Sequence, residues 1–168
     1  RVVFDQSQFV RGAIRTLLLA TVFGLGLTSL IVFVLLASGK ATVAVFLSVP
    51  LSALAAFVGL SIGGGSVNAM VLGGLALVFT RLLFNSLVVL ESIFQRLEAG
   101  AEPEVAAREG AEAVAQPVLG ATLSTIVVFF PVVFLFGVSR FLFTALATAV
   151  VLALVASYVV AMTVIPLY

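Results

Sequence analysis

Five long apolar stretches constrain the fold of this chain more than any other feature of its sequence. Each is long enough to cross a bilayer, which takes about 20 residues in an α-helix. Hydrocarbon offers the backbone no hydrogen-bond partner, so such stretches cross it as helices. Their ranges are 17–36, 41–61, 67–91, 117–137 and 141–165. The sequence therefore predicts an all-α polytopic membrane protein, a bundle of five transmembrane helices plus short interfacial or cytoplasmic helices.

Composition supports a membrane protein and excludes several kinds of chemistry. Of the 168 residues, 63% are hydrophobic and 9% are charged, whereas about 25% are charged in a soluble domain. The net charge is only +1, which argues against nucleic acid as a partner. The absence of cysteine and histidine removes disulfides, thiolate nucleophiles and the usual zinc and haem ligands. We therefore expect no catalytic residue, no metal, no cofactor and no enzyme activity.

The segments outside the spans divide the chain further. Residues 1–16 alternate apolar and polar side chains at helical spacing, which predicts an amphipathic lead-in helix at the interface, with a solvated lead-in as the alternative. Residues 17–168 then form the transmembrane domain. Because the chain begins with Arg1 rather than methionine, we expect it to be cut from a longer protein.

The connection between the third and fourth spans is the charged part of the chain. Residues 96–112 hold seven of its fifteen charges. A surface helix is predicted over 103–115, since Pro103 suits a first helical turn. Glu104, Arg108 and Glu112 are spaced by four, which favours ion pairs along this helix.

The third span, 67–91, is the one span that combines membrane depth with charge. Its polar positions form a seam on an otherwise apolar helix: Thr80, Arg81, Asn85, Glu91 and Ser92. Arg81 and Glu91 are about 15 Å apart along the helix axis, too far for a direct pair. No other span contains an acid. Arg81 is therefore expected to meet an acidic side chain or an anionic lipid from another molecule.

Hydroxyl side chains supply the remaining polarity of the spans. We expect most of them to bond to their own helix backbone or to a neighbouring helix. They are Ser48, Ser52, Thr122, Ser124, Thr125, Thr144, Thr148, Ser157 and Thr163.

Short motifs along the whole chain, in order, resemble those of the resistance-nodulation-division (RND) efflux transporters. They include Phe4-Asp5-Gln6-Ser7, Val49-Pro50-Leu51-Ser52, Gly65-Ser66-Val67-Asn68, Gly73-Gly74-Leu75-Ala76-Leu77, Asn85-Ser86-Leu87-Val88-Val89-Leu90-Glu91-Ser92, Pro117-Val118-Leu119 and Phe130-Pro131-Val132-Val133. The resemblance implies the second to sixth transmembrane helices of the family's N-terminal half, in a bacterial inner membrane. It also implies a periplasmic start and a cytoplasmic end, an orientation that the balance of basic residues leaves open.

One departure from the family pattern bears on function. Family members carry one or two aspartates in the middle of the fourth transmembrane helix, and counting back from Glu91 these positions are Phe84 and Asn85. Neither side chain takes up and releases a proton, so the resemblance implies a permease segment without its acidic proton relay. We expect a degenerate, non-pumping scaffold or accessory subunit, with other membrane subunits and lipids as partners. The alternatives are the visible part of a complete proton-driven pump, with the relay rebuilt around Glu91, and a passive channel along the seam.

Overall fold

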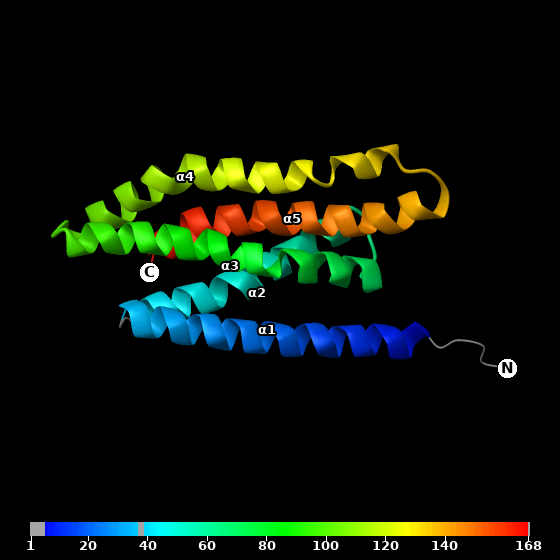
Figure 1. Cartoon of the computed structure of the whole chain (residues 1–168), viewed down its shortest axis with the longest axis horizontal. Coiled ribbons are helices and arrows are strands. Elements are labelled where there is room, and N and C mark those ends of the chain that lie inside the picture. The colour runs from blue at the N-terminus through cyan, green and yellow to red at the C-terminus, as the bar shows by residue number, and fades with distance from the viewer. Residues whose placement is uncertain (1–5, 37–38, 168) are drawn as a thin grey trace.

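The protein is a bundle of long helices without a strand in the part that the structure describes. The computed structural model describes residues 6–36 and 39–167. Their elements are α1 (Gln6–Leu36), α2 (Gly39–Ile62), α3 (Ala69–Glu98), α4 (Pro103–Val127), the 3-10 turn η1 (Phe130–Phe134) and α5 (Gly137–Leu167) (Figure 1).

Four segments of the described chain are long and apolar enough to cross a membrane. They are Thr42–Ile62, Ala69–Glu98, Pro103–Phe134 and Ser139–Leu167. The predicted all-α polytopic membrane fold is confirmed. The first predicted span, 17–36, lies in α1, where several side chains are outside the described set.

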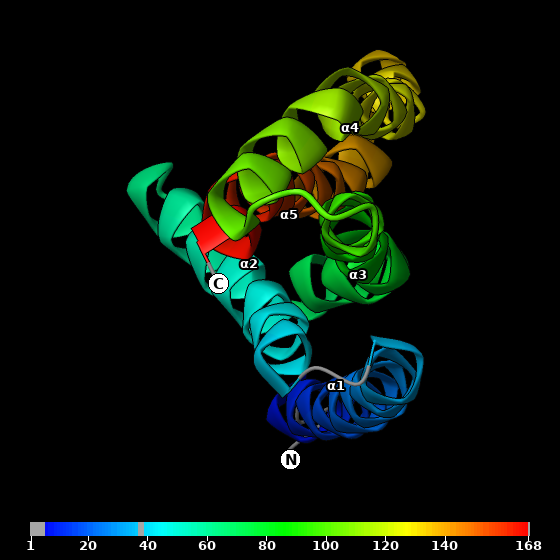
Figure 2. The same cartoon turned by 90° about the vertical axis from the view of Figure 1, so that its left-hand side faces the viewer.

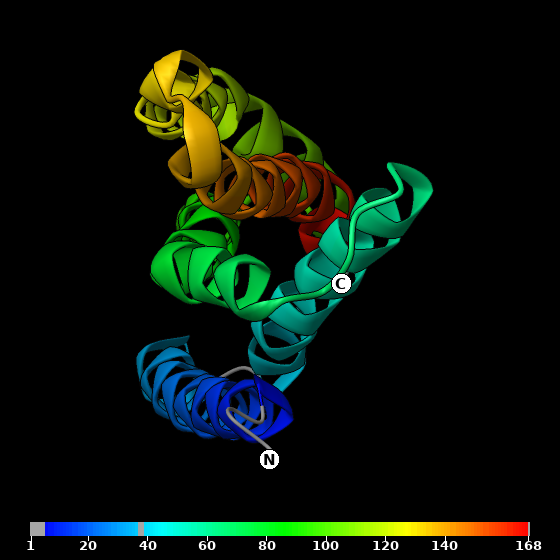
Figure 3. The same cartoon turned by 90° about the vertical axis from the view of Figure 1, so that its right-hand side faces the viewer.

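Helices α3 and α5 pack together at the centre of the bundle. Seen along the helices, α2 and α4 lie on different sides of this pair, and α1 is outermost, against α2 and α3 (Figures 2 and 3). The core is built from fully buried side chains such as Val45 on α2, Val89 on α3 and Leu154 on α5. Lipid replaces water outside, so the outer faces remain apolar: Phe23 on α1 is 78% exposed.

Glycines let α3 approach both of its neighbours closely. A Cβ at Gly74 of α3 would lie 2.8 Å from the carbonyl oxygen of Leu146 on α5. A Cβ at Gly110 of α4 would lie 2.8 Å from the Cα of Ile93 on α3. In both places the obstacle is backbone, which cannot rotate away. These two contacts therefore fix the spacing of α3, α4 and α5.

The helix boundaries differ from those expected at two places. The lead-in and the first span form the single helix α1; residues 1–5 and 37–38 lie outside the described residues. The surface helix predicted over 103–115 is continuous with the following span in α4. Pro117 sits inside α4 because the loss of one backbone bond does not by itself end a packed helix.

Helix α4 ends ten residues before the predicted limit of Gly137. A proline ring clashes with the carbonyl four residues earlier, and for Pro131 that residue is Val127, where α4 stops. The chain continues as η1, with Pro131 in its first positions. Gly137 adopts a φ of +67°, which favours glycine, and starts α5.

The ion pairs predicted along residues 103–115 do not form. In the described ranges, the ion pair present joins Arg96 of α3 to Glu109 of α4. The close approach at Gly110 brings the two helices together at this end, where Ser92 Oγ also donates to the Gly110 carbonyl at 2.9 Å. The packing of α3 against α4 therefore decides which charges pair, rather than the four-residue spacing along α4.

Candidate functional site

A small polar cluster joins the three central helices at the position of the expected relay. Asn85 of α3 is buried, with 1% of its surface exposed. Its Nδ2 donates to Thr122 Oγ1 of α4 at 3.4 Å and to Ser157 Oγ of α5 at 3.3 Å. We call Asn85, Thr122 and Ser157 the Asn85 cluster. Its hydrogen bonds are long, and each joins a different pair of helices.

The hydrogen bonds of the two hydroxyls fix the polarity of the cluster. Thr122 Oγ1 donates to the carbonyl of Val118 at 2.8 Å, and Ser157 Oγ donates to the carbonyl of Leu82 at 3.3 Å. Each hydroxyl hydrogen is therefore used, and its oxygen is left to accept from the amide of Asn85. The cluster is neutral, and none of its members changes charge in the physiological pH range.

Phe84, the other relay position, points away from the cluster. Its side chain is 51% exposed, although its neighbour Asn85 is buried. The guanidinium carbon of Arg81 lies 5.5 Å from the centre of the Phe84 ring, within the range of a cation–π interaction. An aromatic ring thus stands one turn from Arg81 where the family resemblance would place a carboxylate.

Arg81 lacks an acidic partner within the described parts of the chain. Its Nε is buried and has no hydrogen-bond acceptor there. The ion pair found among these residues, Arg96 with Glu109, lies at the end of the bundle. A buried donor without an acceptor is costly.

The remaining seam residues take different directions. Thr80 and Glu91 are exposed, whereas Ser92 bonds to α4. Of the five positions expected to carry function, only Asn85 is buried in the bundle. Arg81 is partly buried, and the other three are exposed: Thr80, Phe84 and Glu91.

The hydroxyl prediction is confirmed at every position. Those of Ser48, Ser52, Thr122, Ser124, Thr125, Thr144, Thr148 and Thr163 donate to backbone carbonyls of their own helix, and Ser157 donates to α3. Sequence reasoning did not identify Thr122 and Ser157 as partners of Asn85, which are 37 and 72 residues away. Ser86 was also missed: it is buried, and its Oγ has no partner in the described residues.

Comparison with known proteins places the chain in a family. The model of the AcrB/AcrD/AcrF family matches residues 1–168. The multidrug resistance protein MdtC of Yersinia pestis bv. Antiqua (strain Angola) is 32% identical over 163 residues, which are 97% of this chain and 16% of that protein. MdtC of Yersinia pseudotuberculosis serotype O:1b (strain IP 31758) shows the same identity and coverage. The chain spans about 16% of the length of these curated relatives. It belongs to the AcrB/AcrD/AcrF family of RND efflux permeases.

Proposed function

We propose that this chain forms transmembrane helices of a bacterial inner-membrane permease of the RND type that has lost its proton relay. In this proposal it serves as a non-pumping scaffold or accessory subunit of a larger membrane complex. The observation that carries the proposal is the Asn85 cluster, a neutral, hydrogen-bonded network at the position where the family resemblance implies a titratable acid.

The physical argument concerns charge. A proton-driven transporter needs a group inside the membrane that binds a proton in one state and releases it in another. Phe84 has no ionisable group, and the amide of Asn85 keeps its hydrogens at any physiological pH. Because both side chains are neutral, a change of pH does not change the charge at either relay position.

Arg81 supports a role inside an assembly. Its buried Nε has no acceptor among the side chains and backbone that the structure describes, and its guanidinium lies over Phe84 on the exposed side of α3. A second membrane subunit with an acidic side chain, or an anionic lipid, would satisfy it. A substrate-transporting partner would then supply the moving charge that this chain lacks.

A second candidate is a working pump in which Glu91 takes over the relay. Glu91 is the acid nearest to the cluster along α3, and it is exposed. The names of the relatives, multidrug resistance proteins, favour this candidate. Its weakness is position, because Glu91 lies six residues and about 9 Å along the axis from Asn85.

The test uses the intact complex reconstituted in vesicles that contain a pH-sensitive dye, with ethidium as the exported probe. We expect no ethidium-dependent proton movement through this chain, and no difference between the natural protein and Glu91→Gln. Proton-coupled export that Glu91→Gln abolishes would establish the second candidate instead. Phe84→Asp serves as the comparison variant, because it places a carboxyl one turn from Arg81.

The scaffold role has its own test. Deleting the chain from the host should disassemble the complex that contains it, measured by the amount and size of the partner subunits in detergent extracts. A complex that stays assembled and fully active without the chain would count against the scaffold role and leave the relay result unaffected.

A further inference from the structure

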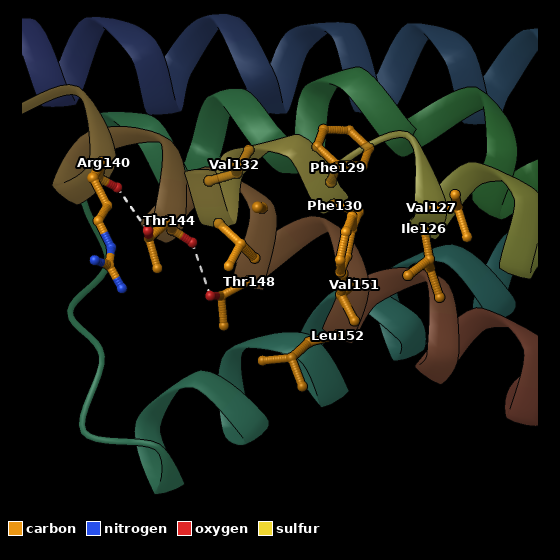
Figure 4. Close-up of a pocket in the computed structure, with 12 residues that line it drawn as sticks. Ile126, Val127, Phe129, Phe130, Val132, Arg140, Thr144, Thr148, Val151 and Leu152 are labelled. Atoms are coloured by element: carbon orange, nitrogen blue, oxygen red, sulfur yellow. Dashed lines mark hydrogen bonds between the residues drawn. The ribbon is translucent and has the colours of Figure 1, made fainter. Parts of the chain in front are cut away.

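Two hollows meet at Arg140, at the end of the bundle where α5 begins. The first lies between η1 and α5 and has a volume of about 490 Å³. The second lies around the glycine turn between α2 and α3 and has a volume of about 640 Å³. Both volumes are typical of small-ligand sites, about 300–1,000 Å³. Figure 4 shows the first, with Arg140 at one end of the row of lining residues.

The two hollows differ in polarity. Phe130, Val133 and Val151 are among the apolar side chains that line the first. The second is also mainly apolar, with Leu60 and Phe141 in its lining, but the glycine turn, Ser66 and Asn68 give it a larger polar share. Two mainly apolar hollows therefore adjoin, and the second is the more polar one.

Three residues of α5 belong to both hollows. Arg140, Thr144 and Thr148 are spaced by four and so form one stripe of the helix. The threonine hydroxyls donate to carbonyls of their own helix, at 2.6 Å and 2.8 Å, and have no hydrogen left to offer a ligand. Arg140 is thus the strong donor at the junction.

Arg140 carries a positive charge that no described acid neutralises, in the first turn of a spanning helix. It is exposed and makes no ion pair with any described residue. It lies in the first turn of α5, where the helix dipole adds partial positive charge rather than neutralising it. Arginine at the end of a spanning helix normally reaches the interface, where phosphates lie.

We propose that these two hollows bind one anionic phospholipid. Its phosphate pairs with Arg140 beside the glycine turn, and one acyl chain lies in the apolar hollow against Phe130, Val133 and Val151. A cation where two mainly apolar hollows meet, beside a turn with exposed polar groups, matches an amphiphile with a negative headgroup. This site is independent of Arg81 and of whether the chain pumps.

The test is lipid retention by the purified protein, measured by native mass spectrometry after delipidation and titration with phosphatidylglycerol or phosphatidylcholine. Arg140→Gln should weaken phosphatidylglycerol binding about tenfold, as expected for the loss of a charge-assisted contact, and leave phosphatidylcholine binding unchanged. Arg140→Lys should retain most of the affinity. Arg11→Gln is the matched control, since Arg11 is an exposed arginine near the start of α1 that lines neither hollow.

A second variant tests the acyl chain. Ala147 lines only the apolar hollow, so Ala147→Phe should fill it and weaken phosphatidylglycerol binding several-fold while Arg140 stays in place. The proposal is overturned if Arg140→Gln and Arg11→Gln have equal effects, or if Ala147→Phe changes nothing. It is also overturned if millimolar inorganic phosphate displaces the lipid, or if cysteine cross-linking from Val151→Cys captures a protein segment in the hollow.

Discussion

Phe84 and Asn85 are neighbours on α3, yet they lie in opposite environments. Asn85 is 1% exposed and bonds to two other helices, whereas Phe84 is 51% exposed and contacts Arg81 of its own helix. At this level of α3, Asn85 is therefore enclosed by α4 and α5, whereas Phe84 stays on the exposed side. The difference indicates that one face of α3 holds the bundle together and that the face of Phe84 does not.

The largest effect on the packing of α3 against α5 is expected from a substitution at Gly74. Because a Cβ there would meet the Leu146 carbonyl oxygen at 2.8 Å, Gly74→Ala should lower the free energy of unfolding by about 1–3 kcal/mol. Gly73→Ala is the control, since a Cβ at Gly73 meets nothing within 4 Å. Unfolding of the protein in mixed detergent micelles by dodecyl sulfate measures both. Equal effects at the two glycines would contradict a tight contact of α3 with α5.

Removing the amide of Asn85 should have the next largest effect. Asn85→Ala loses two interhelical hydrogen bonds and leaves a cavity, which should cost about 1–2 kcal/mol of unfolding free energy. Ser86 is equally buried, but its hydroxyl has no partner in the described ranges. Ser86→Ala should therefore be neutral or stabilising. The same titration in micelles measures both variants. A larger loss of unfolding free energy for Ser86→Ala than for Asn85→Ala would contradict a stabilising role of the Asn85 hydrogen bonds.

On the outer side, the expected effect is smaller. The interaction of Arg81 with the Phe84 ring should contribute about 0.5–1 kcal/mol, because the ring is half-exposed. A double-mutant cycle with Arg81→Gln and Phe84→Leu measures it as the coupling energy. A coupling energy near zero would show that the ring does not hold the guanidinium.

The smallest effect is expected at the charged end of α3. Arg96 and Glu109 are 36% and 54% exposed, so water screens their attraction, and their coupling should be about 0.2–0.5 kcal/mol. Arg96→Gln and Glu109→Gln complete the cycle, which is repeated at high salt, where the coupling should fall. A coupling that salt leaves unchanged would mean that the pair acts by packing rather than by charge.

Hydropathy predicted the fold class because a bilayer leaves few alternatives to spanning helices. It predicted the behaviour of hydroxyls such as Thr122 for the same reason, since a buried hydroxyl without other partners bonds to its own helix. The helix boundaries were less predictable. Pro117 and Pro131 are both prolines in apolar surroundings, but one lies inside α4 and the other starts η1.

The site could be predicted only in part. The polar positions of α3 are visible in the sequence, and so is the absence of an acid in the other spans. Which of these positions face inward depends on how α3 is turned against α5, and Gly74 sets that through a contact with Leu146 that no local pattern encodes. Asn85 and Arg81 are both polar positions in one apolar span, so the sequence alone does not show that Asn85 is buried and Arg81 is only partly buried.

The early end of α4 has a consequence for the membrane around it. After Glu112, the apolar part of α4 has fifteen residues up to Val127, a rise of about 22 Å. The hydrocarbon layer of a typical bilayer is about 30 Å thick. The five residues of η1 add about 10 Å at a rise of about 2.0 Å per residue, so the segment Pro103–Phe134 still reaches across this layer. Crossing on this side therefore depends on η1 as well as on α4, and a mismatch with the lipid chain length would act on that turn.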